Sequence, residues 1–144
     1  MAEGIFIHRA RERGVFENYV VDSAGTGPWH VGNPPDPRAS EVAMRQGVDL
    51  PSIGRQVDPA RDFREFEFIL AMDSDNLANL LHAGAPEERV RLYRSFDPAL
   101  SGEPDHRLDV PDPYFGAGDG FQRVFDMLRS ATDGLLDHLE RERS

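Results

Sequence analysis

The spacing of apolar residues predicts five helices along the chain. Ile5, Phe6 and Ala10 place the first over residues 1–13, and Gly14 ends it. The other four are expected over residues 36–47, in a shorter stretch after residue 58, over residues 74–81, and from about residue 120 to residue 141. An Asp-Pro pair opens two of these segments, which is typical of a capped helix start.

Shorter apolar runs between these segments predict strands. Residues 66–72 contain a near-continuous apolar run, the pattern of a parallel strand covered on both faces. Residues 19–21 are expected as a second short strand, and residues 90–96 alternate in a way that suits a sheet edge. Strands alternating with helices imply a parallel α/β sheet flanked by helices, in which ligands bind where strands end and loops begin.

The length and net charge of the chain limit the number of its domains and the kinds of partner it can bind. The 144 residues suit a single domain spanning residues 1–144. The net charge of −10 argues against binding to nucleic acid or to an anionic membrane surface, because both would repel it. No run approaches the roughly 18 apolar residues of a membrane span, and the first residues are too polar for a signal peptide. We therefore expect a cytoplasmic protein whose phosphate site, if it has one, is built locally.

One loop has the features of a general acid. Asp112 lies between Pro111 and Pro113, so its backbone is stiff. Tyr114 and Phe115 follow directly, and aromatic walls that desolvate a carboxyl raise its pKa toward the range in which it can donate a proton. The alternative is a proline-rich turn in which Asp is a turn former and the aromatic rings pack on the core.

Two further loops follow predicted strands. Ser23 lies among the small residues 22–27, which would allow close approach of a ligand or would form a plain turn. Trp29, in the next loop, could line a pocket or cover the core. Asp73 opens a helix at a strand end and could hold a catalytic Arg or only cap the helix. The five His lack metal-ligand spacing, and no Walker or dinucleotide motif is present, so we expect no metal and no cofactor.

Taken in order, several short segments resemble the low-molecular-weight protein tyrosine phosphatases over the whole chain. Asp-Pro-Tyr alone is a weak signal, but the ordered set is specific. The segments are Met1-Ala2-Glu3-Gly4, Asp22-Ser23-Ala24-Gly25-Thr26, Trp29-His30-Val31-Gly32, Pro35-Asp36-Pro37-Arg38, Arg55-Gln56-Val57, Asp62-Phe63, Met72-Asp73-Ser74-Asp75-Asn76-Leu77 and Asp112-Pro113-Tyr114.

The resemblance implies a three-layer α/β fold with a four-stranded parallel sheet. It also implies a cysteine thiolate that attacks phosphotyrosine, a phosphate loop with an Arg, and an Asp that protonates the leaving phenolate. By motif, Asp112 corresponds to that general acid. Tyr114, Phe115 and Trp29 correspond to residues beside the substrate ring, although Phe115 replaces the more usual Tyr. Ser23 and Asp73 correspond less closely to supports of the phosphate loop.

The chain departs from the family at its start. In the family, the first strand and the Cys-x5-Arg loop come directly before a segment like Met1-Ala2-Glu3, and this chain has no Cys. We therefore expect an N-terminally truncated domain that is inactive as written, whose complete form hydrolyses a phosphotyrosine protein or a small aryl phosphate. The alternatives are a catalytically dead interaction module of the same fold and a related arsenate reductase. The sequence does not predict the oligomeric state.

Overall fold

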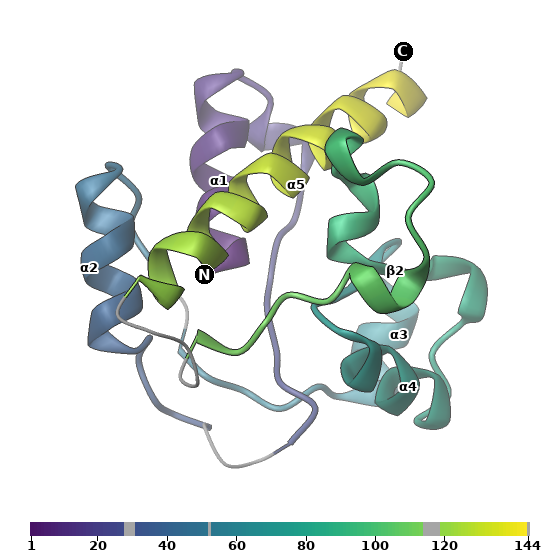
Figure 1. Cartoon of the computed structure of the whole chain (residues 1–144). Helices are drawn as coiled ribbons and strands as arrows, with labels where there is room; N and C mark the ends of the chain where they lie inside the picture. The colour runs from purple at the N-terminus through teal and green to yellow at the C-terminus, as the bar shows by residue number, and fades with distance from the viewer. Residues whose placement is uncertain (28–30, 52, 114–118, 144) are drawn as a thin grey trace.

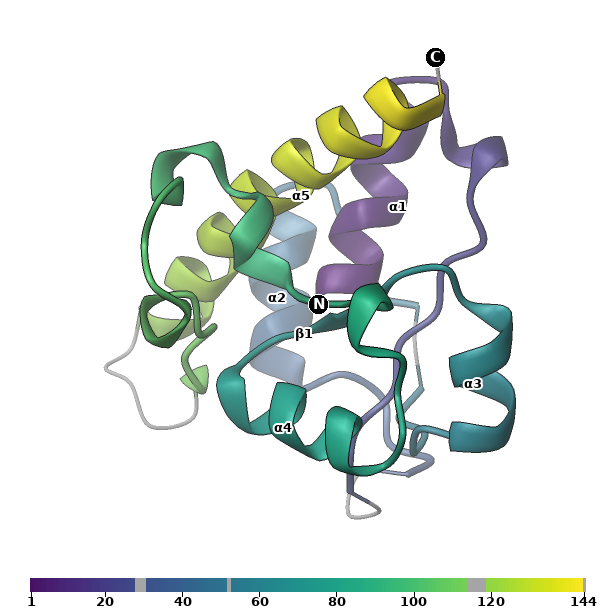
Figure 2. The ribbon, with the colours of Figure 1, turned by 90° about the vertical axis from the view of Figure 1, so that its right-hand side faces the viewer.

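A computed structural model of the chain describes residues 1–27, 31–51, 53–113 and 119–143. Its elements form three layers (Figures 1 and 2). A short parallel sheet of β1 (Ile69–Ala71) and β2 (Val90–Leu92) lies in the middle. The helices α1 (Ala2–Glu12), α2 (Pro37–Arg45) and α5 (Gly120–Arg143) lie on one side, and α3 (Pro59–Glu65) and α4 (Ser74–His82) lie on the other.

The predicted helices are confirmed, and local signals explain where they begin. The carboxylate of Asp36 accepts a hydrogen bond from the backbone N–H of Arg38 at 2.8 Å, with Pro37 in the first turn. Pro59 likewise opens α3, although the Asp58 side chain makes no capping bond there. Gly14 and Gly47 follow α1 and α2 with positive φ angles of 72° and 76°, which an L side chain rarely adopts.

The sheet is smaller than the sequence predicts. β1 and β2 pair in parallel, from Ile69 opposite Val90 to Ala71 opposite Leu92, whereas residues 93–96 form a 3-10 turn. The expected strand at residues 19–21 is wrong, because that segment forms no strand. Val20 there is 87% exposed, and the isolated pairing further along joins Gly25 to Gln56. A strand needs a hydrogen-bonded neighbour, and none of the described residues supplies one beside residues 19–21.

The two faces of β1 pack into two separate apolar clusters. Leu70 and Met72 contact the helical core, defined as the cluster among α1, α2 and α5, while Ile69 and Ala71 contact the cluster beneath α3 and α4. This alternation is the period of two that a strand covered on both faces requires. It confirms the interpretation of the apolar run before Asp73 as a parallel strand covered on both faces.

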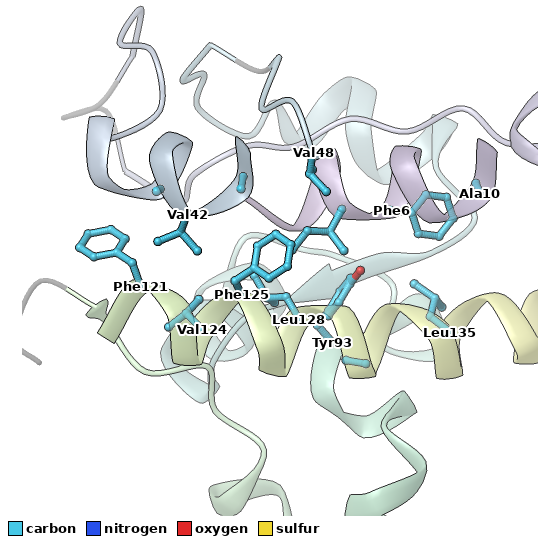
Figure 3. Close-up of a cluster of buried hydrophobic side chains, with 14 of the residues drawn as sticks. Phe6, Ala10, Val42, Val48, Tyr93, Phe121, Val124, Phe125, Leu128 and Leu135 are labelled. Atoms are coloured by element: carbon cyan, nitrogen blue, oxygen red, sulfur yellow. The ribbon is translucent and has the colours of Figure 1, made fainter. Parts of the chain in front are cut away.

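The helical core is built around α5 (Figure 3). Phe125, Leu135 and Leu136 are at most 1% exposed, and they meet Ile5 from α1 and Val42 from α2. The buried hydroxyl groups of Tyr93 and Thr132 form a hydrogen bond with each other inside this core. Thr132 also donates to the carbonyl of Leu128 at 2.6 Å. Burial raises the pKa of Tyr93, so its hydroxyl stays protonated.

A close contact fixes how α5 crosses the turn after β2. A Cβ atom at Gly134 would lie 1.8 Å from the carbonyl oxygen of Phe96. No side chain fits there, so a glycine in the middle of the helix allows the approach despite its low helix propensity. α5 therefore packs directly against the segment that leads from the sheet toward residues 97–113.

Candidate active site

The Asp112 loop, which we define as residues 109–113, is anchored at the carboxyl end of the sheet. The backbone N–H of Val110 donates to the carbonyl of Met72, directly after β1, at 2.8 Å. Arg94, just beyond β2, donates from Nη1 to the carbonyl of Asp109 at 2.9 Å. The loop is thus fastened to both strands at the edge where parallel α/β folds bind their ligands.

Asp112, the residue predicted to be a general acid, is exposed on this loop. Tyr114 and Phe115 lie outside the described residues, so desolvation of Asp112 by their rings stays a prediction. Pro113 and Gly120 approach each other closely, since a Cβ atom at Gly120 would lie 3.1 Å from the carbonyl oxygen of Pro113.

Asp73 and Asp109 both serve the first turn of α4. Asp73 Oδ1 accepts from the backbone N–H of Asn76 at 2.7 Å, which makes Asp73 the N-cap residue. Asp109 Oδ1 accepts from both the backbone N–H and the hydroxyl of Ser74, each at 2.8 Å. The structure thus bears out the capping interpretation of Asp73, while its support of a phosphate loop stays a prediction.

Among the small residues 22–27, Gly25 pairs with the segment around Gln56. The N–H of Gly25 donates to the carbonyl of Arg55, and the N–H of Val57 donates to the carbonyl of Gly25, each at 2.8 Å. Ser23, the predicted support residue, is exposed. Its backbone N–H donates to the Asp22 carboxylate at 2.8 Å. The loop is therefore held by backbone pairing at Gly25.

An ionic cluster reinforces this pairing. Arg55 contacts both carboxylate oxygens of Asp62, at 2.9 and 3.2 Å, and also Asp22 at 3.1 Å. Arg61 and the backbone N–H of Asp58 bond the same Asp62 carboxylate, at 3.1 and 2.8 Å. Asp62 is only 5% exposed. Burial alone would raise the pKa of Asp62, but these hydrogen bonds together hold it below its ordinary value.

Residues 54–57 also hold the far end of the loop that contains Trp29. The N–H of Gly32 donates to the carbonyl of Gly54 at 2.7 Å, and the N–H of Gly54 donates to the carbonyl of Asn33 at 2.8 Å. Residues 54–57 therefore bond both ends of the stretch from Gly25 to Gly32. Trp29 lies within that stretch but outside the described residues, so its predicted contact with a substrate ring is not tested.

Sequence reasoning gave no role to three of the residues that build this site. Asp109 and Arg94 anchor the Asp112 loop, and Arg61 belongs to the ionic cluster. Asp109 lies 35 residues from its partner Ser74, and Arg94 lies 15 residues from the carbonyl that it contacts. No local pattern in the sequence marks these contacts, because each depends on the fold that brings the two segments together.

The described residues offer neither a metal-binding cluster nor a helix that could cross a membrane. In residues 1–27, 31–51, 53–113 and 119–143, no three His, Asp or Glu side chains gather in a way that could hold a metal ion. Over the same residues, none of the helices is both long and apolar enough to cross a membrane.

Known proteins match this arrangement over its length. Residues 1–144 match the profile of the family described as low molecular weight phosphotyrosine protein phosphatase. A low molecular weight protein-tyrosine-phosphatase of Streptomyces coelicolor is 41% identical over 140 residues, covering 94% of this chain and 82% of its own. Protein-tyrosine phosphatase A of Mycobacterium tuberculosis is 39% identical, covering 97% and 83%. The crystal structure of a tyrosine phosphatase from Entamoeba histolytica superposes with a TM-score of 0.87 at 34% identity, covering 99% and 89%.

Proposed function

The chain belongs to the low molecular weight phosphotyrosine protein phosphatase family, and from that premise we propose that it provides the general-acid side of a phosphatase active site. In the complete protein, a cysteine thiolate would attack the phosphorus of an aryl phosphate, and Asp112 would protonate the departing phenolate. The proposed substrates are a phosphotyrosine protein or a small aryl phosphate.

The anchoring of the Asp112 loop carries this proposal. Hydrogen bonds from Val110 to Met72 and from Arg94 to Asp109 hold the loop at the carboxyl ends of both strands. Asp112 itself is exposed, as a residue that meets a bound ester must be. A phenol has a pKa of about 10, so protonating its oxygen as the P–O bond breaks lowers the barrier at neutral pH. The aspartate left behind can then accept a proton from the water that attacks the phosphocysteine.

Other residues take supporting roles in the proposal. Tyr114, Phe115 and Trp29 would contact the ring of the substrate, since aromatic side chains bind a flat ring well. Ser23 and Asp73 would support the loop that binds the phosphate group. The local clamp between Gly25 and Arg55 would hold Ser23 in place.

The nucleophile is the part of the proposal that the 144 residues do not supply, since they contain no Cys. We propose that it is carried by a further strand and loop of the same domain. The sheet favours this: among the described residues β1 pairs only with β2, and Val20, which lies in no strand, is 87% exposed. An apolar side chain and an unpaired strand edge are features that another strand would cover.

The proposal is tested by comparing the 144-residue chain with the native protein purified from its source. We expect the chain to melt cooperatively but neither to hydrolyse p-nitrophenyl phosphate nor to bind vanadate. The native protein is expected to exceed 144 residues by intact mass, to contain a Cys, and to hydrolyse the ester. In it, Asp112→Asn is expected to lower kcat about 10²-fold or more for phenyl phosphate, and less for p-nitrophenyl phosphate with its better leaving group.

Three outcomes would count against the proposal. Hydrolysis by the 144-residue chain would show that the nucleophile lies within it. A native protein that begins at Met1 and lacks activity would favour the interaction module. A native protein that reduces arsenate with a thiol donor and leaves aryl phosphates intact would favour the reductase.

A further inference from the structure

The root of the Asp112 loop contains one residue, Asp109, that is bonded in two directions. The carboxylate of Asp109 accepts two hydrogen bonds from Ser74 at the start of α4, both at 2.8 Å. Its backbone carbonyl accepts the hydrogen bond from Arg94 at 2.9 Å. Asp109 therefore joins the loop to α4 through its side chain and to the end of β2 through its backbone.

The bonds at Asp109 exceed what capping α4 requires. Asp73 already caps that helix from its own N-cap position, at 2.7 Å from the N–H of Asn76. Ser74 contributes its hydroxyl as well as its N–H to Asp109, and a hydroxyl is not one of the helix groups that need a cap. The extra bond fixes where Asp109 lies relative to the helix, as a positioning contact does.

A shift at Asp109 is transmitted to Asp112 because the chain between them is stiff. Val110 is bonded to the carbonyl of Met72, and Pro111 and Pro113 restrict the backbone on both sides of Asp112. Proton donation depends on placing the acid within hydrogen-bond reach of the leaving oxygen, and a misplacement of about 1 Å can cost about 10²-fold in rate.

We propose that Asp109 is a positioning residue, which orients Asp112 by fastening its loop to Ser74 at the start of α4. The proposal rests on the proposed function in one respect, namely that Asp112 is the group that needs orienting. The attachment itself is a property of the chain and can be measured without catalysis.

Amide hydrogen exchange and NMR of the 144-residue chain test the proposal, with Asp109→Ala as the main variant. A residue that only caps α4 would affect the amide of Ser74 and leave Val110 unchanged, whereas a positioning residue also affects Val110. We expect the Val110 amide to exchange about tenfold faster in Asp109→Ala, and the 13C signal of the Asp112 carboxyl to shift. Asp109→Asn keeps an acceptor oxygen and is expected to restore exchange to within about threefold of the original chain.

Three further variants serve as controls. Asp73→Ala weakens the start of α4 without touching the loop, so it should speed exchange at Asn76 but not at Val110. Asp105→Asn changes an exposed carboxylate just before the loop and should change neither signal. Ser74→Ala removes one of the two bonds to Asp109 and should produce a smaller version of the main effect, which keeps the test usable if Asp109→Ala does not fold.

An unchanged Val110 amide and Asp112 carboxyl in both Asp109→Ala and Ser74→Ala would overturn the proposal. The same holds if Asp73→Ala has as large an effect on Val110, because α4 stability alone would then explain it. If these signals respond as expected while the native protein leaves aryl phosphates intact, the attachment stands and the proposed function fails.

Discussion

The helical core and the loops at the carboxyl end of the sheet are held by different interactions. In the helical core, apolar side chains such as Phe125 and Leu135 are almost completely buried and close-packed. In the ionic cluster that joins the loop at Arg55 to α3, Arg55 and Arg61 remain 28% and 46% exposed while they bond to Asp62. The core therefore responds to any change in volume, whereas the loops respond to the loss of particular hydrogen bonds. This separation would allow the site to vary while the scaffold stays intact.

The largest expected effect comes from Gly134→Ala, which adds one methyl group where the core meets the loops. The new Cβ would lie 1.8 Å from the Phe96 carbonyl oxygen, so α5 would have to move away. In most helices this substitution stabilises, but here we expect a loss of about 4–5 kcal/mol in the free energy of unfolding, or failure to fold. Thermal unfolding measures it, and Ser130→Ala on the exposed face of α5 is the control. Unchanged stability would contradict the close contact.

Phe125→Ala tests the packing of the core itself. The ring is 1% exposed and lies at the centre of the cluster in Figure 3. Removing it leaves a cavity and is expected to cost about 3–5 kcal/mol in unfolding free energy, measured with urea. Phe125→Leu, which keeps most of the volume, should cost about 1 kcal/mol. Equal costs for the two would mean that the site relaxes freely.

Asp62→Asn tests the ionic cluster and should have a smaller effect. The amide cannot accept bonds from Arg55, Arg61 and the Asp58 N–H at both of its heavy atoms, so some donors lose their partner. We expect a loss of about 2 kcal/mol in unfolding free energy at neutral pH. Glu65→Gln is the matched control, since Glu65 is exposed and 3.9 Å from Arg61, and it should change stability by less than about 0.5 kcal/mol.

The lowered pKa of Asp62 also predicts a pH dependence. Its folded pKa lies below its ordinary value, so the stabilisation is complete above that ordinary value and is lost as the pH falls through the folded pKa. Urea unfolding from pH 7 to pH 2 should therefore show stability declining on the acid side, with a shallower decline in Asp62→Asn. Parallel curves for the two proteins would remove Asp62 as a source of acid sensitivity.

The smallest expected effect is at Asp36, which caps α2 beside the loop of Trp29. Replacing Asp36 with Ala removes the acceptor for the Arg38 N–H and should cost about 1 kcal/mol. Thermal unfolding gives the value. Asp36→Asn, which retains a capping oxygen, should recover most of it, and a failure to do so would show that the cap is not the source of the effect.

The sequence predicted the helices well because their signals are local. Asp36 with Pro37, and the apolar spacing of α5, need no knowledge of the rest of the chain. The strand expected at residues 19–21 failed for the opposite reason, because β propensity is realised only when a neighbouring strand supplies hydrogen bonds. β1 was predicted because it is covered on both faces, and both of its covering clusters are present.

In the candidate site too, features with local signals were predicted and tertiary contacts were not. The sequence pointed to Asp112 and Asp73 through their neighbours in the chain, and Asp73 does cap α4. It could not assign Asp109 to Ser74, because that contact joins residues 35 apart and depends on the sheet that brings them together. Tertiary hydrogen bonds of this kind leave no periodic trace in a single sequence.

Because residues 54–57 pair with both Gly25 and Gly32, the stretch between these two glycines could be exchanged as a unit. Its two ends are fixed by backbone bonds at Gly25 and Gly32, and Gly32 has a φ of 82° that favours glycine, so insertions or exchanges between these two anchors need not disturb the pairing. We therefore expect a stretch grafted from a relative to form the same backbone hydrogen bonds to residues 54–57. Under the proposed function, substrate preference could therefore diverge in the stretch that carries Trp29, while the Asp112 loop, which has its own anchors, stays the same.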